Sequence, residues 1–180
     1  SSDVCSSDLP PVPANAAEWA KQRDAWMRAL REKVFRGWPE KDDPLALSSL
    51  TKHIAHNRLV TTYGLTSHQD VQLSLTVHTS VEKSPPKRVI LFVSDSYEYE
   101  DLDSLSAEAL WRGELAVAYF FPRGLPASVP ALALADQNSV RRRYMLLGQT
   151  VDSMRVWDVL RAVDALRTKE LFGNTPIAIV

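Results

Sequence analysis

The sequence predicts an α/β fold, in which a mostly parallel sheet carries helices on both faces and an extra helix precedes it. Two observations lead to this prediction. Apolar runs of strand length occur at 89–93, 114–121 and 177–180, and segments with helical periodicity, 102–111 and 139–167, separate them. Strands that alternate with helices form a mostly parallel sheet, because each crossover helix packs back onto a face of that sheet.

Composition excludes several classes of protein. The chain has 180 residues, of which 45% are hydrophobic and 24% charged, and its formal net charge is −1. This is enough for a domain with a buried core, and it is too apolar and too weakly charged for a disordered chain. No apolar run approaches the roughly 20 residues of a membrane-spanning helix. The near-zero charge offers no electrostatic footprint for nucleic acid, so no nucleic-acid partner is expected.

Both ends of the sequence are unusual. Residues 1–9, SSDVCSSDL, resemble a translated sequencing adapter, and we expect them to lie outside the fold. The single cysteine, Cys5, belongs to this segment, so no disulfide or cysteine-ligated metal is expected in the remainder. The sequence stops inside the apolar run 177–180. A strand that ends there would leave backbone hydrogen-bonding groups unpaired, which an intact domain avoids. We therefore expect a linker and helical extension over 10–57, and the N-terminal part of a larger domain, truncated after its fifth strand, over 58–180.

The first predicted element is a helix that begins after Asn15. Asparagine is a favoured N-cap, and Glu18 stands at the third position of a capping box. One apolar stripe follows at helical spacing: Trp19, Trp26, Leu30 and Val34. The Gly-Trp-Pro sequence at 37–39 ends this helix, and a second short helix is predicted over 42–52.

Two strands are predicted next, 58–63 and 71–77, with a turn over 64–70. In the second of them, apolar residues alternate strictly with polar ones: Val71, Leu73, Leu75 and Val77. Strict alternation places one face on the core and the other in water, as in an antiparallel pair at the edge of a sheet. The continuously apolar run 89–93 is expected to be a central parallel strand, and 114–121 another buried strand. The helical region 139–167 is predicted to be one long or broken helix.

Three segments carry a resemblance to a known family. The run RRRYMLLGQTVDSMRVWDVLRAVDAL at 141–166 resembles the helix before the nucleophile in acetyl xylan esterase-like and prolyl-oligopeptidase-like α/β-hydrolases. The turn FPRGLPAS at 121–128 is similar to the loop after the fourth strand of that group, and the segment 19–39 to the helix before its core. The resemblance covers nearly all of the chain from about residue 15 onward. It implies an α/β-hydrolase fold with strand order 1-2-4-3-5.

The function that the resemblance implies is hydrolysis of a carboxylic ester, of the acetyl-ester or carbohydrate-esterase kind, by a serine nucleophile. In α/β-hydrolases this serine follows the fifth strand in a G-x-S-x-G elbow, and the acid and histidine come later. No G-x-S-x-G occurs in the chain, so all three are expected beyond Val180 and the chain alone is expected to be inactive. A prolyl-oligopeptidase-like peptidase and a degenerate, non-catalytic scaffold are the alternatives.

Two loops hold the candidate site residues. The loop after the third strand supplies an oxyanion-hole N–H in this family, and its candidates here are Asp95, Ser96 and Tyr97. The loop contains no glycine or histidine, and a carboxylate beside a developing oxyanion is unfavourable. We therefore expect that the parent protein either uses different oxyanion donors or is catalytically impaired. Arg123 and Gly124 lie in the turn after the fourth strand, where the resemblance implies that they shape the substrate cleft. The alternative interpretation is a turn at the end of a strand, in which these residues only satisfy the hydrogen bonds of their own backbone.

The remaining clusters are interpreted as structural. Asp158, Arg161 and Asp164 are predicted to form a surface ion-pair ladder on one helix. The arginines 141–143 are predicted to form a solvated helix face. Packing roles are predicted for Met145, Met154 and Trp157.

No metal or other cofactor is expected. His53 and His56 have no cysteine or carboxylate at ligand spacing, so they do not predict a metal site. The six glycines form neither G-x-G-x-x-G nor a P-loop, which argues against a dinucleotide-binding module. The expected partner is a small-molecule or carbohydrate ester substrate. The sequence assigns no oligomeric state and no compartment, although the resemblance is compatible with a secreted or periplasmic protein.

Overall fold

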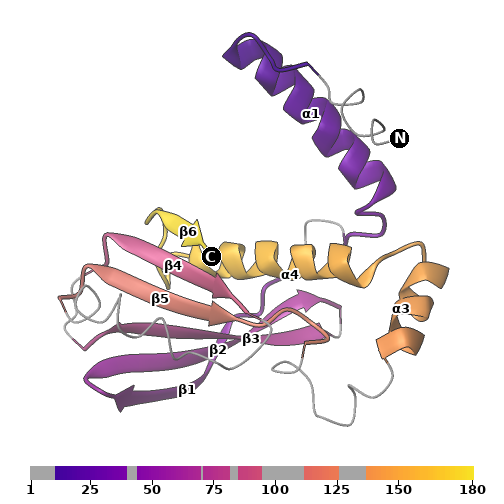
Figure 1. The fold of residues 1–180 in the computed structure, drawn as a ribbon. Helices are drawn as coiled ribbons and strands as arrows, with labels where there is room; N and C mark the ends of the chain where they lie inside the picture. Colours follow the sequence, from indigo (N-terminus) through magenta and orange to yellow (C-terminus); the bar gives the residue numbers. More distant parts are fainter. Residues whose placement is uncertain (1–10, 40–43, 70, 82–84, 95–111, 126–136) are drawn as a thin grey trace, which may run out of the picture.

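The computed structural model describes residues 11–39, 44–69, 71–81, 85–94, 112–125 and 137–180 (Figure 1). A six-stranded sheet forms its body, one long helix lies along a face of the sheet, and the N-terminal helix extends away from it. The strands are β1 (Ser48–Ala55), β2 (Arg58–His68), β3 (Val71–Ser80), β4 (Arg88–Val93), β5 (Leu115–Phe120) and β6 (Ile177–Ile179). The helices are α1 (Ala16–Lys33), α3 (Gln137–Leu146) and α4 (Val151–Leu166).

The sheet has the order β1-β2-β3-β5-β4-β6. Its first three pairings, β1 with β2, β2 with β3 and β3 with β5, are antiparallel, and β4 pairs in parallel with both β5 and β6. Four of the six strands, β2, β4, β5 and β6, therefore run in the same direction. The five predicted strands correspond to β2–β6 and lie in the predicted order 1-2-4-3-5, which is confirmed.

Strand β1 replaces the short helix predicted over 42–52, and that prediction was wrong. β1 pairs with β2 along most of its length, although nearly all its side chains are exposed. His56 and Asn57, both with positive φ, join the two strands. Two consecutive residues with positive φ are typical of the tight hairpin turns that match strand twist, and asparagine is favoured there. Backbone pairing with β2, which local composition does not reveal, decides the conformation of this segment.

Strand β2 also runs further than predicted. The segment 64–70 was predicted as a turn, but β2 continues through Gly64 to His68 and pairs with β3 almost throughout. A Cβ added to Gly64 would lie 3.3 Å from the Leu50 side chain of β1. Glycine at this position therefore allows a close approach of two strands. Besides a bulge or a tight bend, such an approach is a common reason for glycine inside a strand.

The predicted long helix is broken into α3 and α4. Gly148, with φ +71, lies after the end of α3, where glycine adopts the left-handed conformation without strain. Thr150 then caps α4, because its hydroxyl accepts a hydrogen bond from the Ser153 N–H at 3.0 Å. The side chains of the three arginines 141–143 are exposed, as predicted. Met145 is 68% exposed, so its predicted packing role was wrong.

The main core lies between α4 and one face of the sheet. On α4, Ala162, Ala165 and Leu166 have no exposed surface, and Met154 and Trp157 are buried as predicted. The sheet residues buried in this cluster are Leu65, Leu73, Leu75, Val77, Val89, Leu91, Ala116, Ala118 and Phe120. A smaller cluster around Phe92, Val117 and Tyr119 lies on the other face. The helix predicted over 102–111 falls outside the described residues.

Helix α1 begins as predicted. The Asn15 side chain accepts a hydrogen bond from the Glu18 N–H at 2.9 Å, and the Glu18 carboxylate accepts one from the Ala14 N–H. Its predicted apolar stripe is largely exposed, since Trp19 and Trp26 keep nearly half of their surface open to solvent. Within the described residues, no helix combines the length and the apolar character needed to cross a membrane.

Candidate functional site

A pocket of about 400 Å³ opens at the carboxyl ends of β4 and β5. Val93 and Ser94 line it from the end of β4, and Pro122 and Leu125 line it from the loop after β5. The remaining lining residues, Arg155, Val156 and Val159, come from α4. In open α/β sheets, ligands bind outside the carboxyl ends of the parallel strands, so this pocket is the candidate site.

One buried carboxylate holds the loop after β5 in place. Asp158 of α4 is fully buried, and its Oδ1 accepts a hydrogen bond from Arg123 Nη2 at 2.6 Å. The Arg123 Nε donates to both carboxylate oxygens, at 3.1 and 2.9 Å, and the Arg123 backbone N–H donates to Oδ2 at 2.9 Å. The same aspartate therefore binds both the side chain and the backbone of Arg123, which fixes the loop at the wall of the pocket.

The end of β2 completes this buried cluster. The Ser67 hydroxyl donates to Asp158 and accepts a hydrogen bond from Arg123 Nη2 at 3.2 Å. The Ser67 carbonyl oxygen accepts from the Trp157 indole N–H at 2.8 Å, and the neighbouring Thr66 carbonyl accepts from Arg161 at 3.3 Å. Hydrogen bonds between polar groups thus join three elements that are far apart in sequence, although the buried Arg161 Nε has no hydrogen-bond partner among the described residues.

The charge of Arg123 is secured by its surroundings. Burial alone would lower the pKa of the Arg123 guanidinium, because it penalises the charged form. Hydrogen bonds and charge attraction from Asp158, with a contribution from Tyr144, outweigh burial, so the net pKa is raised. Arg123 therefore stays protonated throughout the neutral pH range.

A second arginine holds the loop after β5 through its carbonyl groups. Arg155 donates from Nε to the Arg123 carbonyl oxygen at 3.2 Å, and from Nη2 to the Gly124 carbonyl oxygen at 3.3 Å. Asp152, one turn earlier on α4, accepts from Arg155 Nη1 at 3.1 Å. Gly124 has a φ of +70, a conformation that glycine adopts without strain. Helix α4 consequently holds this loop at both Arg123 and Gly124.

The predicted ion-pair ladder on α4 was wrong. Asp158 and Arg161 are buried, and only the Arg161–Asp164 pair, at 3.8 Å, remains of it. A signal in the sequence could have revealed this, because Asp158 lies four residues after Met154 and four before Ala162, which are both core residues. A charged residue on the apolar stripe of a helix needs a buried partner.

The predicted site residues have different outcomes. Arg123 is buried and does not line the pocket, whereas its neighbours Pro122 and Leu125 do. The role of Arg123 and Gly124 in shaping a substrate cleft stays a prediction. The oxyanion-loop candidates Asp95, Ser96 and Tyr97 lie outside the described residues, directly after the part of the chain that lines the pocket.

The two histidines weighed as metal ligands lie at the far edge of the sheet. His53 is exposed on β1, and His56 lies in the turn to β2. Over the residues that the structure describes, no group of three histidine, cysteine, aspartate or glutamate side chains is placed to hold a metal ion.

The strand order, the parallel centre of the sheet and the pocket at its carboxyl edge define an α/β-hydrolase fold. Neither a protein-family model nor the sequence of a curated protein matches the chain. Among solved structures, it is similar to a proposed acetyl xylan esterase from Bacteroides fragilis, with a TM-score of 0.71 and 13% identity. That likeness covers 91% of this chain and 47% of the other.

Two further structures give the same result. A glucuronoyl esterase from Solibacter usitatus has a TM-score of 0.58 and 14% identity, over 94% of this chain and 53% of its own. Acetyl xylan esterase 1 from Thermoanaerobacterium has a TM-score of 0.52 and 12% identity, over 87% and 49%. The chain spans about half the length of these proteins. The predicted α/β-hydrolase fold, of the kind seen in esterases, is confirmed.

We expect Trp157→Phe to lower the free energy of unfolding by about 1–3 kcal/mol. The substitution keeps an aromatic ring but removes the indole N–H, and it leaves the buried carbonyl of Ser67 without this donor. Urea denaturation followed by circular dichroism would measure the change. Trp19→Phe is the matched control, because Trp19 is 47% exposed, and its effect should stay within about 0.5 kcal/mol. Equal effects of the two changes would contradict the role assigned to this hydrogen bond.

Proposed function

We propose that this chain is the N-terminal part of a serine carboxylic-ester hydrolase that acts on an ester of a carbohydrate. The observation that carries the proposal is the pocket at the carboxyl ends of β4 and β5, in a sheet with the α/β-hydrolase strand order. The structures that share this fold are named acetyl xylan esterases and glucuronoyl esterases. Their names support the ester and the carbohydrate, and neither is demonstrated for this chain.

In this proposal each edge of the pocket has a role. The residues after β4 supply a backbone N–H to the oxyanion, and the loop after β5, held by Asp158 and Arg155, forms a wall against which the substrate rests. The nucleophilic serine lies on an elbow after β6, and the acid and histidine follow later in the chain. The serine attacks the ester carbonyl, the alcohol leaves and water releases the acid from the acyl-enzyme.

The test begins with the gene. We expect the codons after Val180 to encode Gly-x-Ser-x-Gly within about ten residues, since the elbow follows its strand directly. A chain extended to include the complete domain should hydrolyse 4-nitrophenyl acetate with saturation. The 180-residue chain should not exceed the buffer rate, and neither should the extended chain once its elbow serine is replaced by alanine.

Two results would contradict the proposal. The first is a downstream sequence with no serine at the elbow, which would favour the non-catalytic scaffold. This second candidate function rests on the sequence 94–99, which follows β4 and contains no glycine or histidine. The other is saturable turnover by the 180-residue chain itself, which would place the catalytic residues within it.

A further inference from the structure

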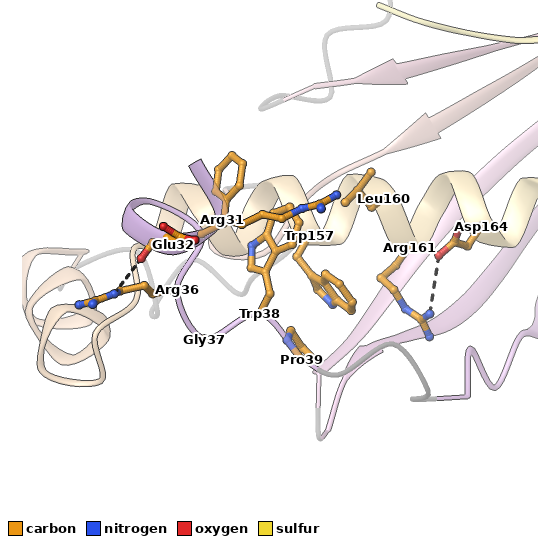
Figure 2. A pocket seen from close by; sticks show the side chains of 11 residues that line it. Arg31, Glu32, Arg36, Gly37, Trp38, Pro39, Trp157, Leu160, Arg161 and Asp164 are labelled. Carbon is orange, nitrogen blue, oxygen red and sulfur yellow. Dashed lines mark hydrogen bonds and ion pairs between the residues drawn. The ribbon is translucent and has the colours of Figure 1, made fainter. Parts of the chain in front are cut away.

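A second hollow, separate from the pocket described above, lies between the end of α1 and α4 (Figure 2). It is a groove of about 880 Å³. Phe35 and Trp38, which follow α1, and Trp157 and Leu160 of α4 form an apolar wall. The rings of Phe35 and Trp38 are stacked at 4.6 Å, and Trp38 and Trp157 are 5.6 Å apart and tilted. The groove therefore offers a ligand an aromatic surface as well as charge.

Hydrogen bonds fix the two sides of the groove to each other. The Trp38 indole N–H donates to the Ser153 carbonyl oxygen at 2.9 Å, and the Gln149 side-chain amide donates to the Gly37 carbonyl oxygen at 2.9 Å. Gly37 has a φ of +74, and a Cβ there would lie 2.5 Å from the Gln149 side chain. The segment that follows α1 is thus held against the start of α4, and these contacts fix the shape of the groove before a ligand binds.

The charges around the groove are not balanced. Three arginines line it, against the two acids Glu32 and Asp164. Arg161 is engaged by Asp164 at 3.8 Å and by a carbonyl of β2, and the Arg36 Nε donates to the Glu32 carbonyl oxygen at 3.0 Å. Arg31 forms no ion pair or side-chain hydrogen bond within the residues that the structure describes. In Figure 2 its side chain extends across the groove in the direction of Leu160.

We propose that this groove binds an acidic saccharide, with the carboxylate of the sugar on Arg31 and a face of the sugar ring against the aromatic wall. A guanidinium binds a carboxylate through two parallel hydrogen bonds, and it retains its charge at every relevant pH. We assign the carboxylate to Arg31 because Arg161 and Arg36 already bind groups of this chain, whereas Arg31 binds none within the described residues. The saccharide part rests on the proposed function, because a carbohydrate ester supplies sugar units beyond the ester that reacts.

The groove is a site distinct from the pocket at the carboxyl ends of the strands. Arg155, Val156 and Val159 face that pocket, whereas Trp157 and Leu160 line the groove from another face of α4. A polymer held in the groove would be anchored by a unit that is not itself hydrolysed. Arg31 is accordingly a binding residue and touches no reacting atom.

The test measures binding by the 180-residue chain, so it does not depend on catalysis. Titration calorimetry would compare xylotriose with the same trisaccharide carrying one glucuronate. We expect the acidic sugar to bind at least about tenfold more tightly, the factor that a charge-assisted hydrogen bond provides. Arg31→Gln should remove that preference and leave the thermal unfolding curve unchanged. Arg23→Gln is the matched control, because Arg23 lies on the same helix, is paired with Asp24 and does not line this groove.

Other outcomes would overturn the proposal. Equal binding of the two trisaccharides, or an unchanged preference in Arg31→Gln, would exclude Arg31 as the carboxylate site. Binding of free glucuronate as tightly as the acidic trisaccharide would exclude the contact of the saccharide with the aromatic wall. If neither sugar binds, the groove is not a saccharide site, whereas the esterase proposal would still be decided by the codons after Val180.

Discussion

Asp158→Ala is expected to lower the free energy of unfolding by about 3–5 kcal/mol, which would be among the largest single effects in this chain. The substitution removes the carboxylate that pairs with the buried Arg123 guanidinium, and with it the acceptor of the Ser67 hydroxyl. A buried charge that loses its partner keeps its full desolvation cost. Urea unfolding of the wild-type and variant chains, followed by circular dichroism, would measure the difference.

Two further variants separate the ion pair from a general effect of mutating α4. Asp152→Ala removes another aspartate of the same helix, but this side chain is 79% exposed and its pair with Arg155 should contribute at most about 1 kcal/mol. The double variant Arg123→Met, Asp158→Leu should regain most of the stability lost in Asp158→Ala, because apolar residues of similar volume often replace a buried pair without loss. Similar destabilisation by the two aspartate changes would argue against the buried cluster.

The stability that Asp158 and Arg123 confer should not depend on the arginine titrating. The pKa of Arg123 is raised in the folded chain. A group whose folded pKa lies above its unfolded value stabilises fully below the unfolded pKa, and it loses this contribution only as pH rises through the folded value. For an arginine, both values lie far above the neutral range. The difference in stability between the double variant Arg123→Met, Asp158→Leu, which leaves no unpaired carboxylate, and the wild type should therefore be the same at pH 7 and pH 9.

Leu166→Ala should lower the free energy of unfolding by about 2–5 kcal/mol. Leu166 has no exposed surface and lies in the cluster between α4 and the sheet, so the shorter side chain leaves a cavity there. Leu160→Ala is a matched control on the same helix, because Leu160 is 43% exposed. That control should cost less than about 1 kcal/mol. Denaturant unfolding with both variants would test whether α4 packs by the face seen in the structure.

The strand order could be predicted because the relevant signals are local or belong to the family resemblance. Continuous apolar runs mark β4, β5 and β6 as strands, although β6 lies at the edge of the described sheet, and the alternation in β3 marks it as a strand with one exposed face. The break between α3 and α4 lies at Gly148, and a glycine within a helical pattern is a local signal of a helix end. Strand β1 could not be predicted in the same way, since its side chains are almost all exposed and its structure comes from pairing with β2.

The candidate site could be predicted less well. The sequence drew attention to Arg123 and to Asp158, but it placed Asp158 on the surface, because the spacing to Arg161 and Asp164 also fits an exposed ladder. Helical spacing says which residues share a face and not which face is buried. Ser67 carried no signal, because a serine at the end of a strand is usually exposed. Arg31 likewise has no feature in the sequence that distinguishes it from other exposed arginines, and only the structure places it in the groove.

By itself, the sequence determined the fold class, the central strands, their order through the family resemblance, and the cap of α1. Each depends on neighbours along the chain or on a recognisable run of residues. The tertiary structure alone decided which charges are buried, how Asp158 joins the ends of β2 and β5, and where α1 and α4 enclose a groove. Those features depend on residues 30 to more than 100 positions apart, such as Arg123 with Asp158 and Trp38 with Ser153. Local pattern carries no information about such distant partners, because only packing of the sheet and its helix brings them together.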